Sequence, residues 1–307
     1  MRQVALTFAW IGLIPAAQAQ PEIRTDDVAL FYRVYDAAGG APSASARQRD
    51  YLDAASDGVR QFIPHRIVSA EALATAIENK RPVYEKARQC VATLPRVRDR
   101  IAAALARLAQ LLPNVKQPPV TILVGGANSG GTTGAAGVLI GIETICSADW
   151  LQTNLEDRLV YLIAHEYVHV QQPVADPDAN PLDGKHTVLQ VALVEGIADF
   201  IAELAAGSAS NTHLQAWTQG RETEMARDFL RDATGTNVLK WAYGGVGTRE
   251  QPGDLGYWVG YRIAKCYYTF AKNKQAAVQE LVRLENPTAI LQHSGWPDGK
   301  DGVECFP

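Results

Sequence analysis

The residues with the clearest chemical potential are His165, Glu166 and His169, which lie in the segment AHEYVHVQQ. On a helix, four residues turn through ~400°, so the two histidines lie ~40° apart and can bind one metal ion from the same side. Glu166 lies ~100° further round, beside the ion, where it can accept a proton from a water molecule. An ordinary amphipathic helix with two satisfied histidines would show the same five residues, so the surrounding sequence has to decide.

A second segment, LVEGIADFIAEL, supplies Glu195, which follows His169 by 26 residues. Catalytic zinc takes three protein ligands and leaves one position open. A glutamate in this apolar segment is costly to bury unless a charge pairs with it, and a metal ion would do so. Asp199, one turn later, can accept the second N–H of a ligating histidine. Gly196 would let the two helices approach closely. The alternative is that both carboxylates face solvent.

The elements that would carry these residues follow from apolar spacing and capping residues. Helices are predicted at residues 43–62, 70–80, 97–112, 155–172, 187–206 and 257–272, with another beginning near Pro82. Two β-branched runs, 120–124 and 138–142, predict strands. The run between them is rich in Gly, Ser and Thr. We expect a flexible hairpin loop there, with a functional flap as the alternative.

Composition narrows the class of protein. The chain has 307 residues, 47% of them hydrophobic and 20% charged, with a formal net charge of -4, which indicates a globular protein. No Lys/Arg run points to nucleic acid, so no nucleic-acid partner is expected. Residues 1–19 combine a positive start, a short apolar run and a small-x-small site, which predicts a cleaved signal peptide. A buried N-terminal helix is the alternative.

Four cysteines follow the predicted cleavage site, namely Cys90, Cys146, Cys266 and Cys305. An even count in an exported protein indicates disulfides, and three connectivities are possible. We prefer a bond from Cys266 to Cys305, which would tie down the C-terminal tail. Four buried free thiols are the alternative.

The motif H-E-x-x-H followed by E-x-x-x-D on a second helix resembles the gluzincin metallopeptidases, to which thermolysin belongs. Five stretches are similar to a bacterial family of predicted Zn-dependent proteases of otherwise undefined function: ALFYRVYD, YLDAAS, AHEYVHV, VEGIADF and GYWVGYRIAK. The resemblance covers most of the chain after the signal peptide. It implies a zinc site and a peptidase-like fold, but no particular substrate.

The resemblance implies a role for each residue. His165, His169 and Glu195 become the zinc ligands, Glu166 becomes the general base, and Asp199 supports a ligand. A Tyr or His in the C-terminal lobe of such enzymes steadies the oxyanion. Tyr257 is our first candidate and Tyr261 the second, although a packed aromatic helix face would explain both. Such enzymes also pair substrate with an edge strand, for which residues 138–142 are the candidate unless that strand is internal.

We therefore expect an α+β, mostly helical chain, with a zincin-like lobe and a small β-sheet beside the HExxH helix. Residues 20–150 would form an N-terminal helical lobe with the sheet, and residues 151–307 the zinc-binding helical lobe of one catalytic unit. The expected function is an exported zinc-dependent peptidase with a zinc-activated water, acting on peptides or proteins in the periplasm or outside the cell, without a membrane anchor. A non-catalytic zinc-containing envelope protein and a zinc hydrolase of non-peptide amides are the alternatives.

Overall fold

Helices make up most of the chain. The structure, a computed structural model, describes residues 21–148, 150–173, 182–209, 211–245 and 247–299. The α-helices are α1 (Asp26–Ala37), α2 (Ala44–Arg47), α3 (Asp57–Phe62), α4 (Ala70–Asn79), α5 (Arg81–Val91), α6 (Leu94–Leu111), α7 (Ile142–Ser147), α8 (Leu155–His169), α9 (Val188–Ala206), α10 (Thr212–Thr218), α11 (Glu222–Asp232), α12 (Leu255–Phe270), α13 (Lys274–Arg283) and α14 (Pro287–Ser294). The shorter turns are the π-helical η1 (Gln48–Leu52) and η2 (Ile63–Ile67) and the 3-10 turn η3 (Val238–Lys240). The strands are β1 (Ile23–Arg24), β2 (Val120–Leu123), β3 (Gly131–Gly134) and β4 (Gly137–Gly141). The expectation of a mostly helical α+β chain with a small sheet is confirmed.

Local signals explain where the two chemistry-bearing helices begin. The side chain of Asn154 accepts a hydrogen bond from the backbone N–H of Asp157 at the start of α8. Thr187 does the same for Gln190 at the start of α9. Such caps satisfy backbone donors that have no partner within the helix. Both predicted helices are confirmed, although α8 ends at His169 rather than at residue 172.

The sheet departs from the expected hairpin. Its strand order is β1-β2-β4-β3, and β2 pairs with β4 in parallel rather than antiparallel. The glycine-rich connection contributes β3, which a tight turn at residues 135–136 joins to the antiparallel β4. Gly137, the first residue of β4, has φ +103°. The flexible-loop prediction is therefore wrong. β4 is internal and β3 is the edge strand, so the proposed edge role of residues 138–142 is also wrong.

The predicted helix over residues 43–62 is broken into α2, η1 and α3. Ser56 caps α3, because its hydroxyl accepts from the N–H of Gly58. The carboxylate of Asp27 in α1 binds both the N–H and the hydroxyl of Ser56, at 3.0 and 2.5 Å. This side-chain contact competes with continued helix. The helices predicted at 70–80, after Pro82, at 97–112 and at 257–272 are confirmed as α4, α5, α6 and α12 within a few residues.

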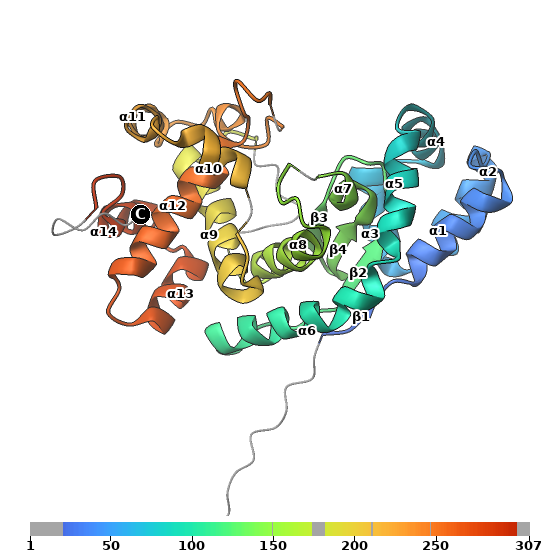
Figure 1. Ribbon diagram of the computed structural model, residues 1–307, viewed down its shortest axis with the longest axis horizontal. Helices are drawn as coiled ribbons and strands as arrows, with labels where there is room; N and C mark the ends of the chain where they lie inside the picture. The colour runs from blue at the N-terminus through green and yellow to red at the C-terminus, as the bar shows by residue number, and fades with distance from the viewer. Residues whose placement is uncertain (1–20, 149, 174–181, 210, 246, 300–307) are drawn as a thin grey trace, which may run out of the picture.

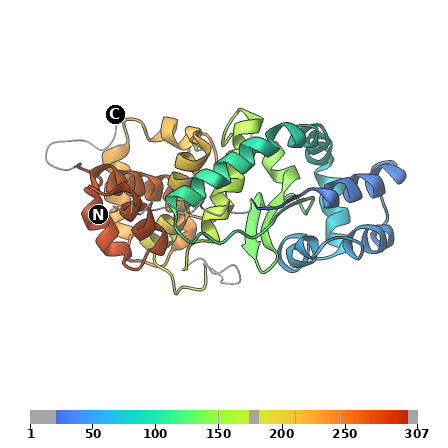
Figure 2. The ribbon, with the colours of Figure 1, turned by 90° about the horizontal axis from the view of Figure 1, so that it is seen from below.

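α8 and α9 lie in the middle of the molecule, with α1 to α5 toward one end and α11 to α14 toward the other (Figure 1). α6 runs beneath α8 and α9 in Figure 1 and crosses in front of them in the view from below (Figure 2), and it packs against both. Its buried stripe includes Val97, Ile101 and Leu108. One hydrophobic cluster extends from Ile23 to Trp296, so the core is continuous across the expected boundary at residue 150. The division into two lobes stays a prediction.

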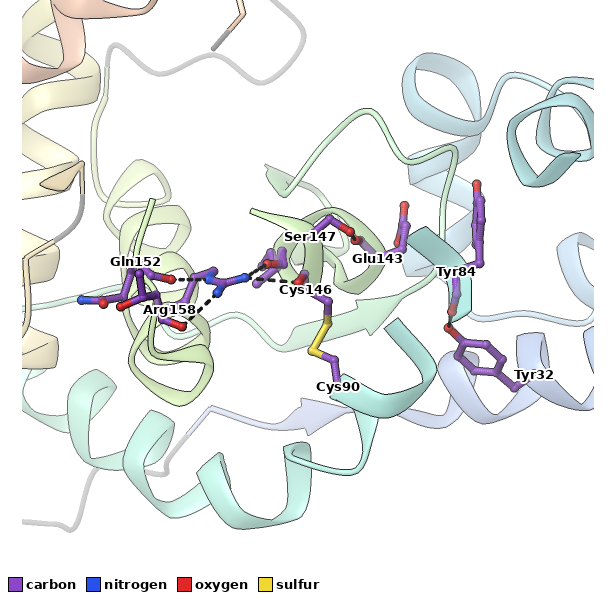
Figure 3. The surroundings of a disulfide bond; sticks show 10 residues. Tyr32, Tyr84, Cys90, Glu143, Cys146, Ser147, Gln152 and Arg158 are labelled. Atoms are coloured by element: carbon purple, nitrogen blue, oxygen red, sulfur yellow. Dashed lines mark hydrogen bonds between the residues drawn. A yellow bond between two sulfur atoms is a disulfide. The ribbon is translucent and has the colours of Figure 1, made fainter. Parts of the chain in front are cut away.

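A disulfide joins Cys90 in α5 to Cys146 in α7 (Figure 3). Arg158 of α8 donates from its guanidinium to the backbone carbonyls of Ile145 and Cys146, at 2.8 and 3.2 Å. A cation at the C-terminal end of α7 also suits the helix dipole. The disulfide and Arg158 together connect α5, α7 and α8. Cys266 is disulfide-bonded too. Cys305, the partner predicted for it from the sequence, lies outside the described residues.

None of the described helices is both long and apolar enough to cross a membrane. The predicted signal peptide at residues 1–19 lies outside the described residues.

Candidate metal centre and cleft

Three potential metal ligands converge where α8 packs against α9. The Nε2 atoms of His165 and His169 are 3.0 Å apart. Oε2 of Glu195 lies 3.4 Å from Nε2 of His165 and 3.3 Å from Nε2 of His169. All three side chains are buried or nearly so. The geometry thus brings together the three residues that the sequence singled out as ligands.

The donor set fits zinc. Ligands ~2.0–2.2 Å from a tetrahedral ion are separated from one another by roughly 3.3–3.5 Å. The three distances of 3.0 to 3.4 Å in this group come close to that spacing. Imidazole nitrogen and carboxylate oxygen are ligands that catalytic zinc takes, and three of them leave a fourth position open.

Neighbouring side chains fix the ring orientation of both histidines. Nδ1 of His165 lies 2.8 Å from Oδ1 of Asp199, and Nδ1 of His169 lies 2.7 Å from Oε1 of Gln172. The amide nitrogen of Gln172 donates to the carbonyl of Val194, which identifies its oxygen as the acceptor facing His169. Each Nδ1 atom therefore faces an acceptor oxygen, which favours the tautomer that carries the proton on Nδ1. The lone pair on each Nε2 is then free to face the metal.

The electrostatics of the group favour a positive charge at its centre. Burial raises the pKa of Glu195, but the imidazoles of His169 and His165 outweigh it and hold the pKa well below its usual range. Burial lowers the pKa of His165, but the carboxylates of Asp199 and Glu195 outweigh it and raise the pKa well above its usual range. Protons on the imidazoles and a metal ion would compete for this position.

A family model described as a Predicted Zn-dependent protease (DUF2268) matches residues 97–292. The chain belongs to this family. The matched part extends from α6 to α14 and contains all three converging donors. The family description and the donor set agree on Zn²⁺ as the cofactor. No curated protein and no solved structure matches the chain.

Glu166 lies beside the three donors without being one of them. Its side chain packs against Gly131 of β3, where a Cβ atom would approach its Cγ within 2.5 Å and its Oε1 within 2.7 Å. Burial raises the pKa of Glu166, and the imidazoles of His169 and His165 only partly offset this effect. A carboxylate with a raised pKa is a better proton acceptor. The neighbouring residue Gly131 leaves room for it.

A cleft of about 960 Å³ opens onto this group. Its walls come from both expected lobes, from Gln61 and Arg66 on one side to Tyr243 and Tyr257 on the other. β3 forms part of the wall and is the open edge of the sheet. In this member of the Zn-dependent protease family, the three potential metal ligands therefore line a cleft that is large enough for a ligand.

The backbone of β3 has unpaired groups on its open edge. The N–H of Gly141 donates to the carbonyl of Gly130 at 3.0 Å. Antiparallel ladders alternate, so Thr132 also directs its N–H and C=O toward β4. Gly131 and Thr133 then face away from the sheet. Ser129 already donates to the carbonyl of Gly131, and Thr133 keeps both groups for an incoming strand.

Three contacts escaped the sequence interpretation. The hydroxyl of Tyr243 donates to Oε1 of Glu195 at 2.6 Å, although only a break at nearby glycines marked this segment. Gln172 follows His169 by three residues, a spacing that could have identified it.

Gly196 does contact a neighbouring helix closely, but that helix is α12 rather than α8. A Cβ atom on Gly196 would meet the backbone of Gly260 at 2.1 Å. The expected role of Gly196 between the two metal-binding helices is wrong.

The two candidate tyrosines of α12 have different surroundings. Tyr257 lines the cleft, and its ring contacts that of Tyr243 edge-on at 6.2 Å. Among the described residues its hydroxyl has no hydrogen-bond partner. Tyr261 instead donates to Glu203, away from the cleft. Asp199 receives hydrogen bonds from Tyr161 and Asn211, at 2.7 and 2.8 Å, which hold it against His165.

Proposed function

We propose that this protein is a zinc-dependent peptidase that hydrolyses peptide bonds, with Glu166 as the general base. The observation that carries the proposal is the convergence of His165, His169 and Glu195 within 3.4 Å of one another, with Glu166 beside them and β3 next to Glu166. A structural zinc site is normally closed by four protein ligands. The gluzincin assignment, with H-E-x-x-H and E-x-x-x-D on two helices, is part of this proposal.

The chain's own residues perform the remaining steps. Zn²⁺ held by the three donors supplies a Lewis acid that polarises the peptide carbonyl and lowers the pKa of water. Glu166 accepts a proton from the attacking water and passes it to the leaving amine. Asp199 and Gln172 keep the two imidazoles in the orientation that exposes Nε2.

Tyr257 is the proposed donor to the developing oxyanion. Burial raises its pKa well above the usual range, so its hydroxyl keeps its proton and can donate. Tyr243 acts on a ligand instead, because its hydroxyl is already bound to Glu195. The two tyrosines therefore have separate roles, one toward substrate and one toward the metal ligand.

The open edge of β3 is the proposed binding site for the substrate backbone. Thr133 offers one donor and one acceptor, and an extended peptide can pair with both. This arrangement favours a peptide over a small amide, which has no second peptide group to pair. A zinc hydrolase of non-peptide amides and a non-catalytic envelope protein remain the competing functions, and neither makes use of an open strand edge beside a base.

Export through the signal peptide at residues 1–19 is also part of the proposal, with the protein in the periplasm or outside the cell. The Cys90–Cys146 disulfide supports it, because such bonds persist in oxidising compartments. The lobes at residues 20–150 and 151–307 would act as one catalytic unit, since the cleft is lined from both.

The test is a digest of a diverse peptide library by the zinc-loaded protein, read by mass spectrometry, beside the same protein after chelation. Cleavage that disappears on chelation and returns with zinc is the expected result. Zinc-loaded protein that cleaves small amides but no peptide would favour the non-peptide hydrolase. Protein that binds zinc and cleaves neither would favour the non-catalytic function.

A further inference from the structure

Arg66 is the single Lys or Arg among the described residues that line the cleft. Its side chain is half-buried. Within the described part of the chain, no carboxylate lies within 4.0 Å of its guanidinium, and its guanidinium makes no hydrogen bond. Other arginines are neutralised, for example Arg88 by Asp36 and Arg100 by Asp157. A guanidinium in the wall of a cleft that has no carboxylate beside it keeps its charge and its N–H donors available for a group that enters the cleft.

The backbone around Arg66 is held in an unusual conformation. Arg66 lies in the π-helical turn η2, and its carbonyl accepts a hydrogen bond of 3.0 Å from the side chain of Asn128. Val68 has φ +71° and ψ -60°, and the N–H of Ser69 donates across it to the carbonyl of Ile67. A β-branched residue rarely adopts this tight turn, and such strain is often found at functional sites. The turn thus presents Arg66 from a fixed position.

Arg66 is located near the reacting end of the cleft. Asn128, which binds its carbonyl, comes three residues before Gly131, the first residue of β3. Gly131 in turn contacts Glu166. Arg66 and Glu166 line the same cleft. No ion pair or hydrogen bond joins them in the described part of the chain, so Glu166 does not use the hydrogen-bonding capacity of the guanidinium.

Apart from Glu166, the carboxylates that line the cleft already have partners. Glu195 and Asp199 face the two imidazoles, and Asp254 accepts from the N–H of Gly244 at 3.0 Å. Apart from the proposed zinc ion, the guanidinium of Arg66 is therefore the one permanently charged cation that the described cleft offers to an incoming carboxylate. A guanidinium binds a carboxylate in a bidentate manner, which fixes its position as well as its charge.

We propose that Arg66 binds a carboxylate of the peptide substrate close to the bond that is cut. The carboxylate is either the free C-terminus or an Asp or Glu side chain, and this substrate class rests on the proposed peptidase function. In the first case the enzyme removes residues from the C-terminus, and in the second it cuts beside acidic residues. The guanidinium makes the same contact in both.

The test measures binding rather than turnover. Zinc-loaded protein carrying Glu166→Gln is titrated by calorimetry with three peptides of one apolar sequence: a free acid, a C-terminal amide, and an amide with one residue replaced by Glu. At least one of the two carboxylate peptides should bind roughly 10- to 100-fold more tightly than the neutral amide, the range expected for a charged hydrogen-bonded contact. The tighter of the two identifies the source of the carboxylate.

Adding Arg66→Gln should reduce this preference to about equal binding, whereas Arg66→Lys should keep part of it, because an ammonium retains the charge without the planar fork. Arg60→Gln is the matched control, since Arg60 lies six residues earlier, pairs with Asp57 and does not line the cleft. It should leave the preference unchanged. Thermal melts of all variants check the fold.

Equal binding of the three peptides, no binding of any, or a preference that survives Arg66→Gln would each overturn the proposal. Turnover separates this outcome from the proposed function. Wild-type protein that cleaves acid and amide peptides equally well is a peptidase in which Arg66 has no such role. Protein that prefers carboxylate peptides in titration but cleaves none retains the binding site and is not a peptidase.

Discussion

Gly131 on the edge strand and Glu166 on the metal-binding helix are so close that a Cβ atom on Gly131 would come within 2.5 Å of Cγ of Glu166. Gly131→Ala should therefore push the carboxylate from its position. The atoms that must move belong to the end of a flexible side chain, so we expect the fold and the zinc content to survive. Misplacement of a catalytic group by ~1 Å can cost about 100-fold in rate, and kcat should fall by roughly 10- to 100-fold.

Gly130→Ala is the matched control, because a Cβ atom there meets only Cγ1 of Ile145 at the ordinary distance of 3.7 Å. It should retain activity within about twofold, since it adds a methyl group without displacing a neighbour. Equal kcat for the two variants would show that Gly131 does not control the position of Glu166.

Thr133 provides a second test, on substrate binding. Thr133→Pro removes the N–H that faces the open edge and leaves the ladder to β4 intact, because proline is tolerated on edge strands. Loss of one hydrogen bond should lower kcat/KM for peptides by roughly 3- to 10-fold, mainly through KM. Thr133→Val keeps the N–H and should behave like the wild type. If both variants lose the same activity, the peptide does not pair with β3 at this residue.

Tyr243 should affect metal affinity. Tyr243→Phe removes the hydrogen bond to Oε1 of Glu195, and loss of such a contact to a ligand raises the zinc dissociation constant by roughly 10- to 100-fold. Competition with a chelator measures this constant directly. Tyr257→Phe is the control, because its hydroxyl is not bound to a ligand, and it should lower turnover while leaving zinc affinity unchanged. Weaker zinc binding in Tyr257→Phe, with unchanged zinc affinity in Tyr243→Phe, would contradict the two proposed roles.

The buried carboxyl of Glu143 should make the stability of the fold depend on pH, independently of the metal centre. This carboxylate is 0% exposed, accepts from the N–H of Ala127, and has one oxygen without a partner. Burial raises its pKa from 4.5 to about 7. The folded state therefore binds more protons at Glu143 than the unfolded state between these values. The contribution of Glu143 to stability is fully present below pH 4.5 and is lost as pH rises toward 7.

The contribution lost over that interval is about 3 kcal/mol. Glu143→Gln does not titrate, so the difference in unfolding free energy between wild type and variant should shift in favour of the variant from pH 5 to pH 8. Urea denaturation at several pH values measures it. A difference that stays constant with pH would mean that Glu143 ionises with an ordinary pKa.

The sequence was a good guide where the signal is local. Asn154 and Thr187 cap α8 and α9. Helical geometry alone puts His165 and His169 on one face of α8, and Glu195 and Asp199 on one face of α9. Once two such helices pack together, the buried carboxylates must face the imidazoles. This is why the donor set could be foreseen without knowledge of the rest of the fold.

The parts that could not be foreseen depend on contacts distant in sequence. Tyr243 reaches Glu195 across 48 residues, and no local pattern marks it. β3 contains only Gly and Thr, so it lacks the apolar alternation of a strand and forms because β4 lies beside it. The parallel pairing of β2 with β4 is likewise decided by the whole sheet, and this reassigned the open edge from β4 to β3.

The most direct test of the account compares zinc-loaded wild type with Glu166→Gln in one peptide digest, with metal content measured on the same samples. Glu166 is not one of the three proposed metal ligands, so the variant should keep one zinc ion per chain. A general base contributes about 10²- to 10⁴-fold, and turnover should fall by that amount. Full activity in a variant that retains zinc would contradict the assignment of Glu166 as the base, and with it the proposed mechanism.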